Sequence, residues 1–193
     1  MSLRYALLAI LRVGPLSGYD LAKQFSQSVG HVWHAPDSQI YPELRKMETE
    51  GLIEGEVEER GARRTRRNYH VTEAGDRAFL EWMASPMVYH RVRDPAHVRA
   101  AYLEATTPEA ARSFLENHIE QWQGEFDQWE SELRRIDAIT SPMLVRRLEA
   151  TPAEDRERTV AFKYFAYEGL VDRARSEIAW ARRGLKLIDR LEA

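Results

Sequence analysis

Five arginines stand within eight residues of this chain, and their side chains are its clearest candidates for chemistry. They lie in the segment ERGARRTRRNYHVTEAG, residues 59–75, as Arg60, Arg63, Arg64, Arg66 and Arg67. Guanidinium groups stay charged and bind phosphate oxygens through paired hydrogen bonds. The whole protein has 28 Lys and Arg against 31 Asp and Glu, a net charge of −3, so any attraction to polyanions must be local. Such a cluster alone is usually a solvated surface run, and its meaning depends on the elements that carry it.

The residues on either side of the arginine cluster predict two short antiparallel strands joined by an arginine-rich turn. Apolar side chains alternate with polar ones around Ile53 and Val57 before the cluster and at Tyr69 and Val71 after it. Glutamates in the first strand lower the total charge without screening the turn, because screening in cells acts over about 8 Å. Arginines at the tip of such a ribbon can lie along a DNA backbone or enter the minor groove.

Helical patterns flank this ribbon on both sides. Ser17 is the expected N-cap of the second helix, and Thr72 is the expected N-cap of the helix after the ribbon. Pro42 fits the first turn of the third helix, where a missing N–H has little effect. The predicted helices cover residues 2–12, 17–28, 38–50 and 72–84. Three helices, a ribbon and a fourth helix follow the order of a winged helix-turn-helix, so the expected fold class is mainly α with a two-stranded wing.

The third helix is predicted to be apolar on one side and polar on the other. With Ile40, Leu44 and Met47 facing inward, a turn of about 100° per residue directs the polar side chains outward. Arg and Lys donate to guanine edges in the major groove and Gln pairs with adenine, whereas Ser and Tyr more often hold phosphates. The start of the second helix offers backbone N–H groups to a phosphate. The predicted DNA-binding residues are Ser17, Tyr19, Ser38, Gln39, Tyr41, Arg45, Lys46, Arg63, Arg64 and Arg66.

Residues 32–75 resemble the core of the PadR transcriptional regulators. The shared features are IYP and a following leucine in the third helix, EGLI at its end, a tyrosine in the second strand and TEAG at the next helix start. The segments YALLAIL and GPLSGYDL near the N-terminus are similar too. The wing departs from the family pattern, because Gly61, Ala62 and Arg63 stand where a proline is common. The matching residues are Ile40, Tyr41, Pro42, Leu44, Met47, Glu50, Gly51, Leu52, Ile53, Tyr69, Thr72, Glu73, Ala74 and Gly75.

This resemblance covers residues 3 to about 84 by motif, and the helical remainder resembles the larger PadR branch by layout. It implies a homodimer that binds a pseudo-palindromic operator in double-stranded DNA and represses transcription. It also implies release by a small molecule, often a phenolic or planar aromatic compound. The expected domains are a winged helix-turn-helix over residues 1–86 and a helical dimerisation and effector domain over residues 87–193.

The C-terminal half contains two long ladders of apolar residues at steps of three and four. The first runs from Leu115 to Ile136 and the second from Val160 to Ile188, a spacing that favours close helix packing. At 1.5 Å per residue the last helix would be roughly 50 Å long, more than a small domain needs. The ladders could pair inside one chain, but this excess length favours a homodimer. The predicted dimer residues are Tyr164, Tyr167, Val171, Ile178, Leu185 and Ile188.

Several classes of function are disfavoured by what the sequence lacks. The absence of cysteine removes disulfides, thiolate catalysis and cysteine-based zinc sites. No Gly-rich phosphate loop, HExxH or GxSxG motif points to an enzyme. No apolar run is long enough for a membrane span, and a cytoplasmic location is the expectation. His31, His34 and Asp37 lie close in sequence but have no second histidine cluster to complete a metal site, so no metal or cofactor is expected.

Two alternatives stay open at the level of sequence. The aromatic side chains of the helical half could form the core or line an effector pocket, and no pocket residue can be chosen. The alternative function is a helical protein-interaction adaptor whose winged module binds protein rather than DNA. Exposed apolar residues on the third helix would favour the adaptor, and polar or basic ones favour a DNA-binding regulator.

Overall fold

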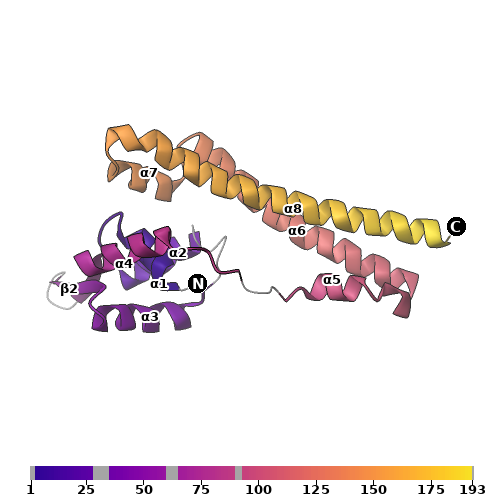
Figure 1. Ribbon diagram of the computed structural model, residues 1–193, viewed down its shortest axis with the longest axis horizontal. Coiled ribbons are helices and arrows are strands. Elements are labelled where there is room, and N and C mark those ends of the chain that lie inside the picture. The colour runs from indigo at the N-terminus through magenta and orange to yellow at the C-terminus, as the bar shows by residue number, and fades with distance from the viewer. Residues whose placement is uncertain (1–2, 28–34, 60–64, 90–92, 193) are drawn as a thin grey trace. The chain divides into compact units, whose positions relative to one another are not determined.

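The computed structural model describes residues 3–27, 35–59, 65–89 and 93–192, and its elements are labelled in Figure 1. The chain divides into two compact units. The first contains residues 1–87 together with 145–151, and the second contains residues 88–144 and 152–193. The expected boundary between residues 86 and 87 as a limit of independent domains stays a prediction.

The helices of the first unit pack around one apolar core. They are α1 (Leu3–Leu11), α2 (Gly18–Gln27), α3 (Asp37–Thr49) and α4 (Glu73–Ala84). Each helix turns its apolar side inward, as the spacing of three and four residues predicted. The side chains that are almost completely buried include Leu7, Leu8, Leu21, Phe25, Ile40, Leu44, Met47 and Ile53. The winged helix-turn-helix order is therefore confirmed.

A small antiparallel sheet completes this unit. The described strands are β1 (Leu16–Ser17), β2 (Ile53–Glu59) and β3 (Thr65–Val71), in the order β1-β3-β2. In the register of the β2–β3 ribbon, Gly55 is opposite Tyr69. The sequence analysis missed β1, because two residues are too few to show an alternating pattern.

One threonine hydroxyl fixes the start of α4. Thr72 Oγ1 accepts a hydrogen bond from the Gly75 N–H at 3.1 Å, which confirms Thr72 as an N-cap. The same hydroxyl donates to the carbonyl of Gly51 at 2.6 Å. Gly51 has a φ of +72°, a left-handed conformation that favours glycine just past a helix end. The end of α3 and the start of α4 are thereby held together across the ribbon.

The second unit is built on two long helices. In Figure 1, α6 (Pro108–Asp137) and α8 (Arg156–Glu192) run side by side. Shorter elements accompany them: α5 (Pro95–Ala100), η2 (Leu103–Ala105) and η3 (Ala153–Asp155). At Gly184 of α8, an added Cβ would lie 2.8 Å from Leu115 Cδ1 of α6, so the two helices approach closely there. Among the described residues, no helix has the length and apolar character needed to cross a bilayer.

The C-terminal part of α6 contains a buried carboxylate, Glu132, with nearby polar partners. Ser141 donates to Glu132 Oε1 at 2.6 Å, and Lys163 Nζ lies 3.8 Å from the same oxygen. Burial, with the Glu132 charge as a smaller cause, raises the pKa of the neighbouring Tyr167 well above its usual range. Ile139, in the turn that follows α6, has a φ of +53°. The cluster joins the end of α6 to the start of α7 (Pro142–Glu149) and to α8.

Helix α7 contributes to the first unit as well. From Val145 onward its residues group with the winged helix. There Arg146 Nη2 donates to the carbonyl oxygens of Gly14 and Pro15, at 3.3 and 3.2 Å. The turn after α1 is thus held by a residue more than 130 positions later in the chain.

The apolar ladder of α8 is largely used inside the chain. Tyr167, Val171 and Ile178, predicted as dimer residues, are 5%, 2% and 6% exposed and lie on the helix side that packs against α6. Tyr164, Leu185 and Ile188 are half-buried. The dimer role predicted for Tyr167, Val171 and Ile178 is corrected accordingly, and that of Tyr164, Leu185 and Ile188 stays a prediction. The apolar sides of α6 and α8 pack against each other, because the chain reverses direction between the two helices.

Gly75→Ala should destabilise the winged unit. Its new Cβ would lie 2.0 Å from the Leu52 carbonyl oxygen, so backbone would have to move. We expect the free energy of unfolding to fall by roughly 1–3 kcal/mol, as measured by urea unfolding. The matched control is Gly124→Ala on α6, where nothing lies within 4 Å of the added methyl group and a gain of about 0.5–1 kcal/mol is expected. Equal effects of the two substitutions would contradict the close approach at Gly75.

Candidate nucleic-acid interface

Helix α3 presents a polar and basic surface because its other side is buried. Ile40, Leu44 and Met47 are at most 1% exposed. The side chains predicted to face outward are exposed, as are Gln39 and Tyr41, which were predicted on the flanks; the outward set is Ser38, Pro42, Arg45, Lys46 and Thr49. Within the described residues, neither Arg45 nor Lys46 is paired with a carboxylate. The orientation predicted for this helix is confirmed, and two cations on it are available to a ligand.

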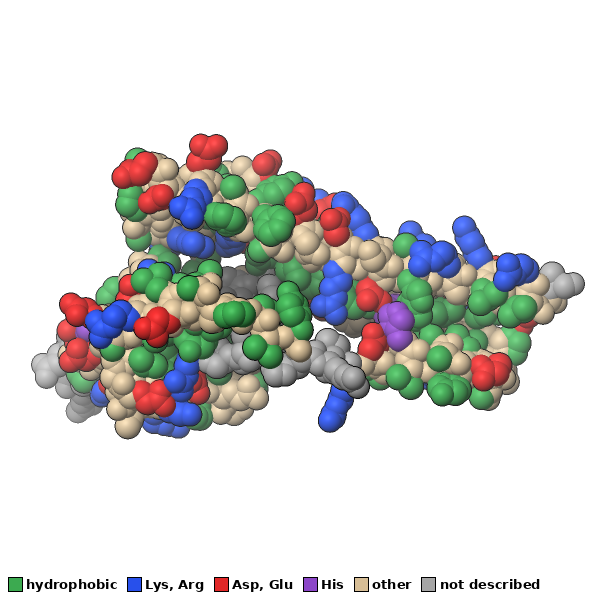
Figure 2. Space-filling view, in the orientation of Figure 1, with side chains coloured by type: hydrophobic (Ala, Val, Ile, Leu, Met, Phe, Trp, Pro, Cys, Tyr) green, Lys and Arg blue, Asp and Glu red, His purple; other side chains and the backbone are tan. Residues whose placement is uncertain are grey.

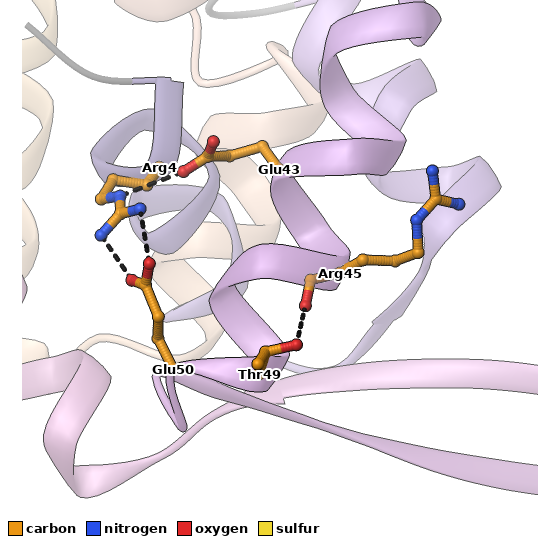
Figure 3. Close-up of polar contacts among 5 residues, drawn as sticks. All are labelled: Arg4, Glu43, Arg45, Thr49 and Glu50. Carbon is orange, nitrogen blue, oxygen red and sulfur yellow. Dashed lines mark hydrogen bonds and ion pairs between the residues drawn. The ribbon is translucent and has the colours of Figure 1, made fainter.

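An arginine of α1 neutralises two carboxylates on the opposite flank of α3. Arg4 Nε donates to Glu43 Oε1 at 3.0 Å, and Arg4 Nη1 donates to Glu50 Oε2 at 2.7 Å. The hydrogen bond with Glu50, aided by Glu43, raises the pKa of the Arg4 guanidinium. Figure 3 shows this network, with the Arg45 side chain extending away from it. The charges of Glu43 and Glu50 are thereby neutralised on the α1 side, away from Arg45.

A second pair of charges joins α3 to the base of the wing. Glu48 accepts hydrogen bonds from Arg67 of β3 and from the Gly55 N–H of β2, the latter at 3.1 Å. The bond to Glu48 raises the pKa of the Arg67 guanidinium, which also lies 5.9 Å from the centre of the Tyr69 ring. These hydrogen bonds connect α3 to both strands of the ribbon at this point.

Three tyrosines surround an open hollow between α2, α3 and the ribbon. The hollow has a volume of about 580 Å³, and Tyr19, Tyr41, Arg67 and Tyr69 contribute to its lining. Tyr19 is 69% exposed and Tyr41 is 37% exposed, so their hydroxyl groups are accessible. Tyrosine hydroxyl groups are common donors to DNA phosphates. Both side chains are therefore accessible, and the DNA contacts predicted for them stay predictions.

Ser17 has the N-cap role predicted for it. Its side chain is buried, accepts from the Asp20 N–H at 3.1 Å and donates to the Asp20 carboxylate at 2.8 Å. The hydroxyl is therefore used within the protein, as the first residue of the α2 cap requires. The predicted phosphate contact at this helix start depends on backbone N–H groups and stays a prediction.

The tip of the wing lies outside the described residues, and so do Arg63 and Arg64. Arg66 is on β3, opposite Glu58 in the register, with a side chain that is not described. The segment with His31 and His34, considered for a metal, is also outside the described residues. The residues predicted to bind DNA did not include Glu48, Arg67 or Tyr69, although Arg67 belongs to the arginine cluster. The period of two along β3 was the signal that Arg67 and Tyr69 share a face.

Comparison with known proteins agrees with this architecture. Residues 7–81 match the model of the transcriptional regulator PadR-like family, and residues 92–189 match that of the virulence activator alpha C-terminal domain. The chain belongs to the PadR-like family of transcriptional regulators. Membership confirms the predicted regulator class and gives the adaptor alternative no support. The two matches together also confirm the larger PadR branch, in which a long helical half follows the winged helix.

Two curated relatives are similar in sequence. The negative transcriptional regulator PadR of Bacillus subtilis is 28% identical over 142 residues, which cover 73% of this chain and 78% of that protein. A probable transcriptional regulator of Mycobacterium tuberculosis is 32% identical over 87 residues, 45% of this chain and 46% of its own. Both are regulators by name, in keeping with the family.

Solved structures share the fold. Bacillus subtilis PadR in complex with operator DNA has a TM-score of 0.76 at 24% identity, covering 96% of this chain and 97% of that one. The same relative in complex with p-coumaric acid has a TM-score of 0.71 at 24% identity, with coverages of 97% and 95%. The virulence activator AphA of Vibrio cholerae has a TM-score of 0.72 at 23% identity, with coverages of 98% and 99%.

Replacing Arg4 with methionine should weaken the attachment of α3 to α1. Glu43 and Glu50 would lose their shared partner and repel each other, so we expect a loss of about 1 kcal/mol in the free energy of unfolding. The control is Arg77→Met, because the Arg77–Glu73 pair is 3.8 Å long and far more exposed. Urea unfolding of both variants at low salt measures the difference. Identical midpoints would mean that the Arg4 network does not hold α3.

Proposed function

We propose that this protein is a sequence-specific transcriptional repressor that binds double-stranded operator DNA through α3 and the wing. The observation that carries the proposal is the exposed row of Gln39, Arg45 and Lys46 on a helix whose other side is buried. Such a helix fits a major groove, where these side chains reach base edges. The similar Bacillus subtilis protein is named a negative regulator and has been solved with operator DNA, which supports repression.

The repressor would act as a homodimer formed through the outer face of α8. Phe162 and Phe165 are 63% and 69% exposed, and Leu187 and Leu191 continue this face toward the C-terminus. These residues lie opposite the side that packs against α6. Figure 2 shows exposed hydrophobic side chains among charged ones over the long helices. A symmetric pair of winged units would read half-sites of a pseudo-palindrome, about 34–36 Å apart or a multiple of it.

A small aromatic molecule would release the DNA. Support comes from the Bacillus subtilis relative, which has been solved in complex with p-coumaric acid, a phenolic compound. The helical unit of this chain is rich in aromatic side chains, such as Trp122, Trp129 and Trp180, that can stack on a planar ring. The proposal assigns no pocket residue.

Alanine at Arg45 or Lys46 should mainly reduce base preference. Losing a bidentate contact to a base costs about 1–3 kcal/mol, so operator affinity should fall at least about fivefold while scrambled DNA is bound nearly as before. The double substitution Arg63→Ala and Arg64→Ala should instead weaken both duplexes. It should also reduce the slope of log affinity against log salt by roughly two, since each phosphate contact contributes about 0.9.

Fluorescence anisotropy with operator and scrambled duplexes at several salt concentrations measures both effects. The operator is obtained first by selecting bound duplexes from a random pool. Failure of the wild-type protein to enrich any sequence would refute the repressor proposal. Equal losses on both duplexes for the α3 variants would refute the assignment of base contacts to α3.

Phe165→Glu should convert the dimer into a monomer. A charge in an apolar interface is poorly solvated, so the sedimenting species should fall from twice 22.4 kDa to 22.4 kDa at micromolar concentration. The control is Arg182→Glu, an exposed position about 100° away around α8. Wild-type protein that sediments at 22.4 kDa would contradict the homodimer itself.

A further inference from the structure

The hydrogen bonds of Glu48 suggest a role in DNA recognition beyond the base-contacting residues. Glu48 lies in the last turn of α3, where its side chain is about one quarter exposed. One oxygen, Oε1, accepts from both the Arg67 guanidinium and the Gly55 N–H. A single carboxylate therefore connects the recognition helix to both strands of the ribbon.

Gly55 provides the space that this arrangement needs. A Cβ at position 55 would lie 2.4 Å from Arg67 Nε and 2.7 Å from Glu48 Oε1. Gly55 is paired with Tyr69, and Arg67 is paired with Val57, so all four residues share one face of the ribbon. The side chains of Glu48 and Arg67 thus occupy the space that a side chain at position 55 would need.

The pair also decides what Arg67 can bind. The Arg67 side chain is 48% exposed and lies at the edge of the hollow formed with Tyr19 and Tyr41. Without Glu48, this guanidinium would be an unpaired cation close to the DNA-binding surface. An added cation strengthens binding to any sequence, because phosphates are the same along all DNA. Glu48 cancels that charge and fixes its position.

We propose that Glu48 is a specificity-determining positioning residue: it holds the wing to α3 and keeps Arg67 from binding DNA phosphates. The inference rests on the proposed function, since it concerns how the same surface distinguishes operator from other DNA. A regulator must reject a large excess of nonspecific sites, so weakening nonspecific binding raises its effective selectivity.

The test compares full-length wild-type protein with Glu48→Ala, Glu48→Gln and Arg67→Ala. Each is titrated by anisotropy with the selected operator and a scrambled duplex at several salt concentrations. Glu48→Ala should bind scrambled DNA about three- to tenfold more tightly at low salt, with a salt slope steeper by about 0.9. Its ratio of operator to scrambled affinity should fall about tenfold. Glu48→Gln, which can still accept from the Gly55 N–H, should show a smaller fall.

Arg67→Ala separates the two possible roles of the arginine. If Arg67 is held by Glu48, this variant removes no phosphate contact, so the salt slope should stay unchanged. The Glu48 carboxylate left without its partner should weaken both duplexes severalfold by repulsion, and the operator more because the wing is no longer held to α3. The matched control is Glu56→Ala, an exposed glutamate on the other face of β2. It removes the same charge without releasing an arginine, so it should shift both duplexes equally.

Two results would overturn the inference. One is a Glu48→Ala titration that matches Glu56→Ala on both duplexes. Another is an Arg67→Ala variant whose slope falls by about 0.9 on both duplexes, because Arg67 would then be a phosphate contact. If Glu48→Ala fails to fold by circular dichroism, the Arg67→Ala result decides. Wild-type protein that binds no DNA would instead refute the proposed function, and the inference with it.

Discussion

One-sided burial of α3 is the constraint on which the proposed DNA-binding surface depends. Three side chains in a row, Ile40, Leu44 and Met47, are removed from water, and each is worth about 1.5–3 kcal/mol of apolar burial. A rotation of the helix by even one residue would expose part of that row. The positions of Arg45 and Lys46 are therefore set by the core beneath them. The packing of the buried side chains determines the orientation of α3, and this orientation determines where the charged side chains lie.

Charge on this surface is distributed by pairing. Three glutamates in the second half of α3 and at its end are matched to arginines on neighbouring elements: Glu43 and Glu50 to Arg4, and Glu48 to Arg67. Arg45 and Lys46 are exposed beside these paired charges. This explains how a protein with a net charge of −3 can present a basic face, since the sum over the chain says little about one patch.

Much of the winged unit could be predicted from the sequence because its signals are local. The inward row of α3, the caps at Ser17 and Thr72 and the period-two strands each depend on residues a few positions apart. Strand β1 could not be predicted, because it exists only through pairing with β3, over 50 residues away. The Glu48–Arg67 pair joins residues 19 apart in sequence and depends on the ribbon register.

The helical half shows a different limit of sequence reasoning. Periodicity in α6 and α8 correctly indicated closely packed helices, but it does not encode whether the partner belongs to the same chain. Excess length favoured a second copy for a seam that includes Tyr167 and Val171, and these residues instead pack within the chain. The apolar ladder of α8 packs against α6. On its other side α8 has a second, smaller group of apolar side chains, which includes Phe165.

The contribution of α7 makes the winged unit discontinuous in sequence. Seven residues, 145–151, belong to this unit although they follow α6 in the chain. Among them, Arg146 donates hydrogen bonds to the carbonyl groups of the turn that follows α1. A gene fragment ending after α4 would thus encode a module missing one of its own pieces. Exchange of this module between regulators by simple recombination at residue 87 would leave that turn without its distant partner.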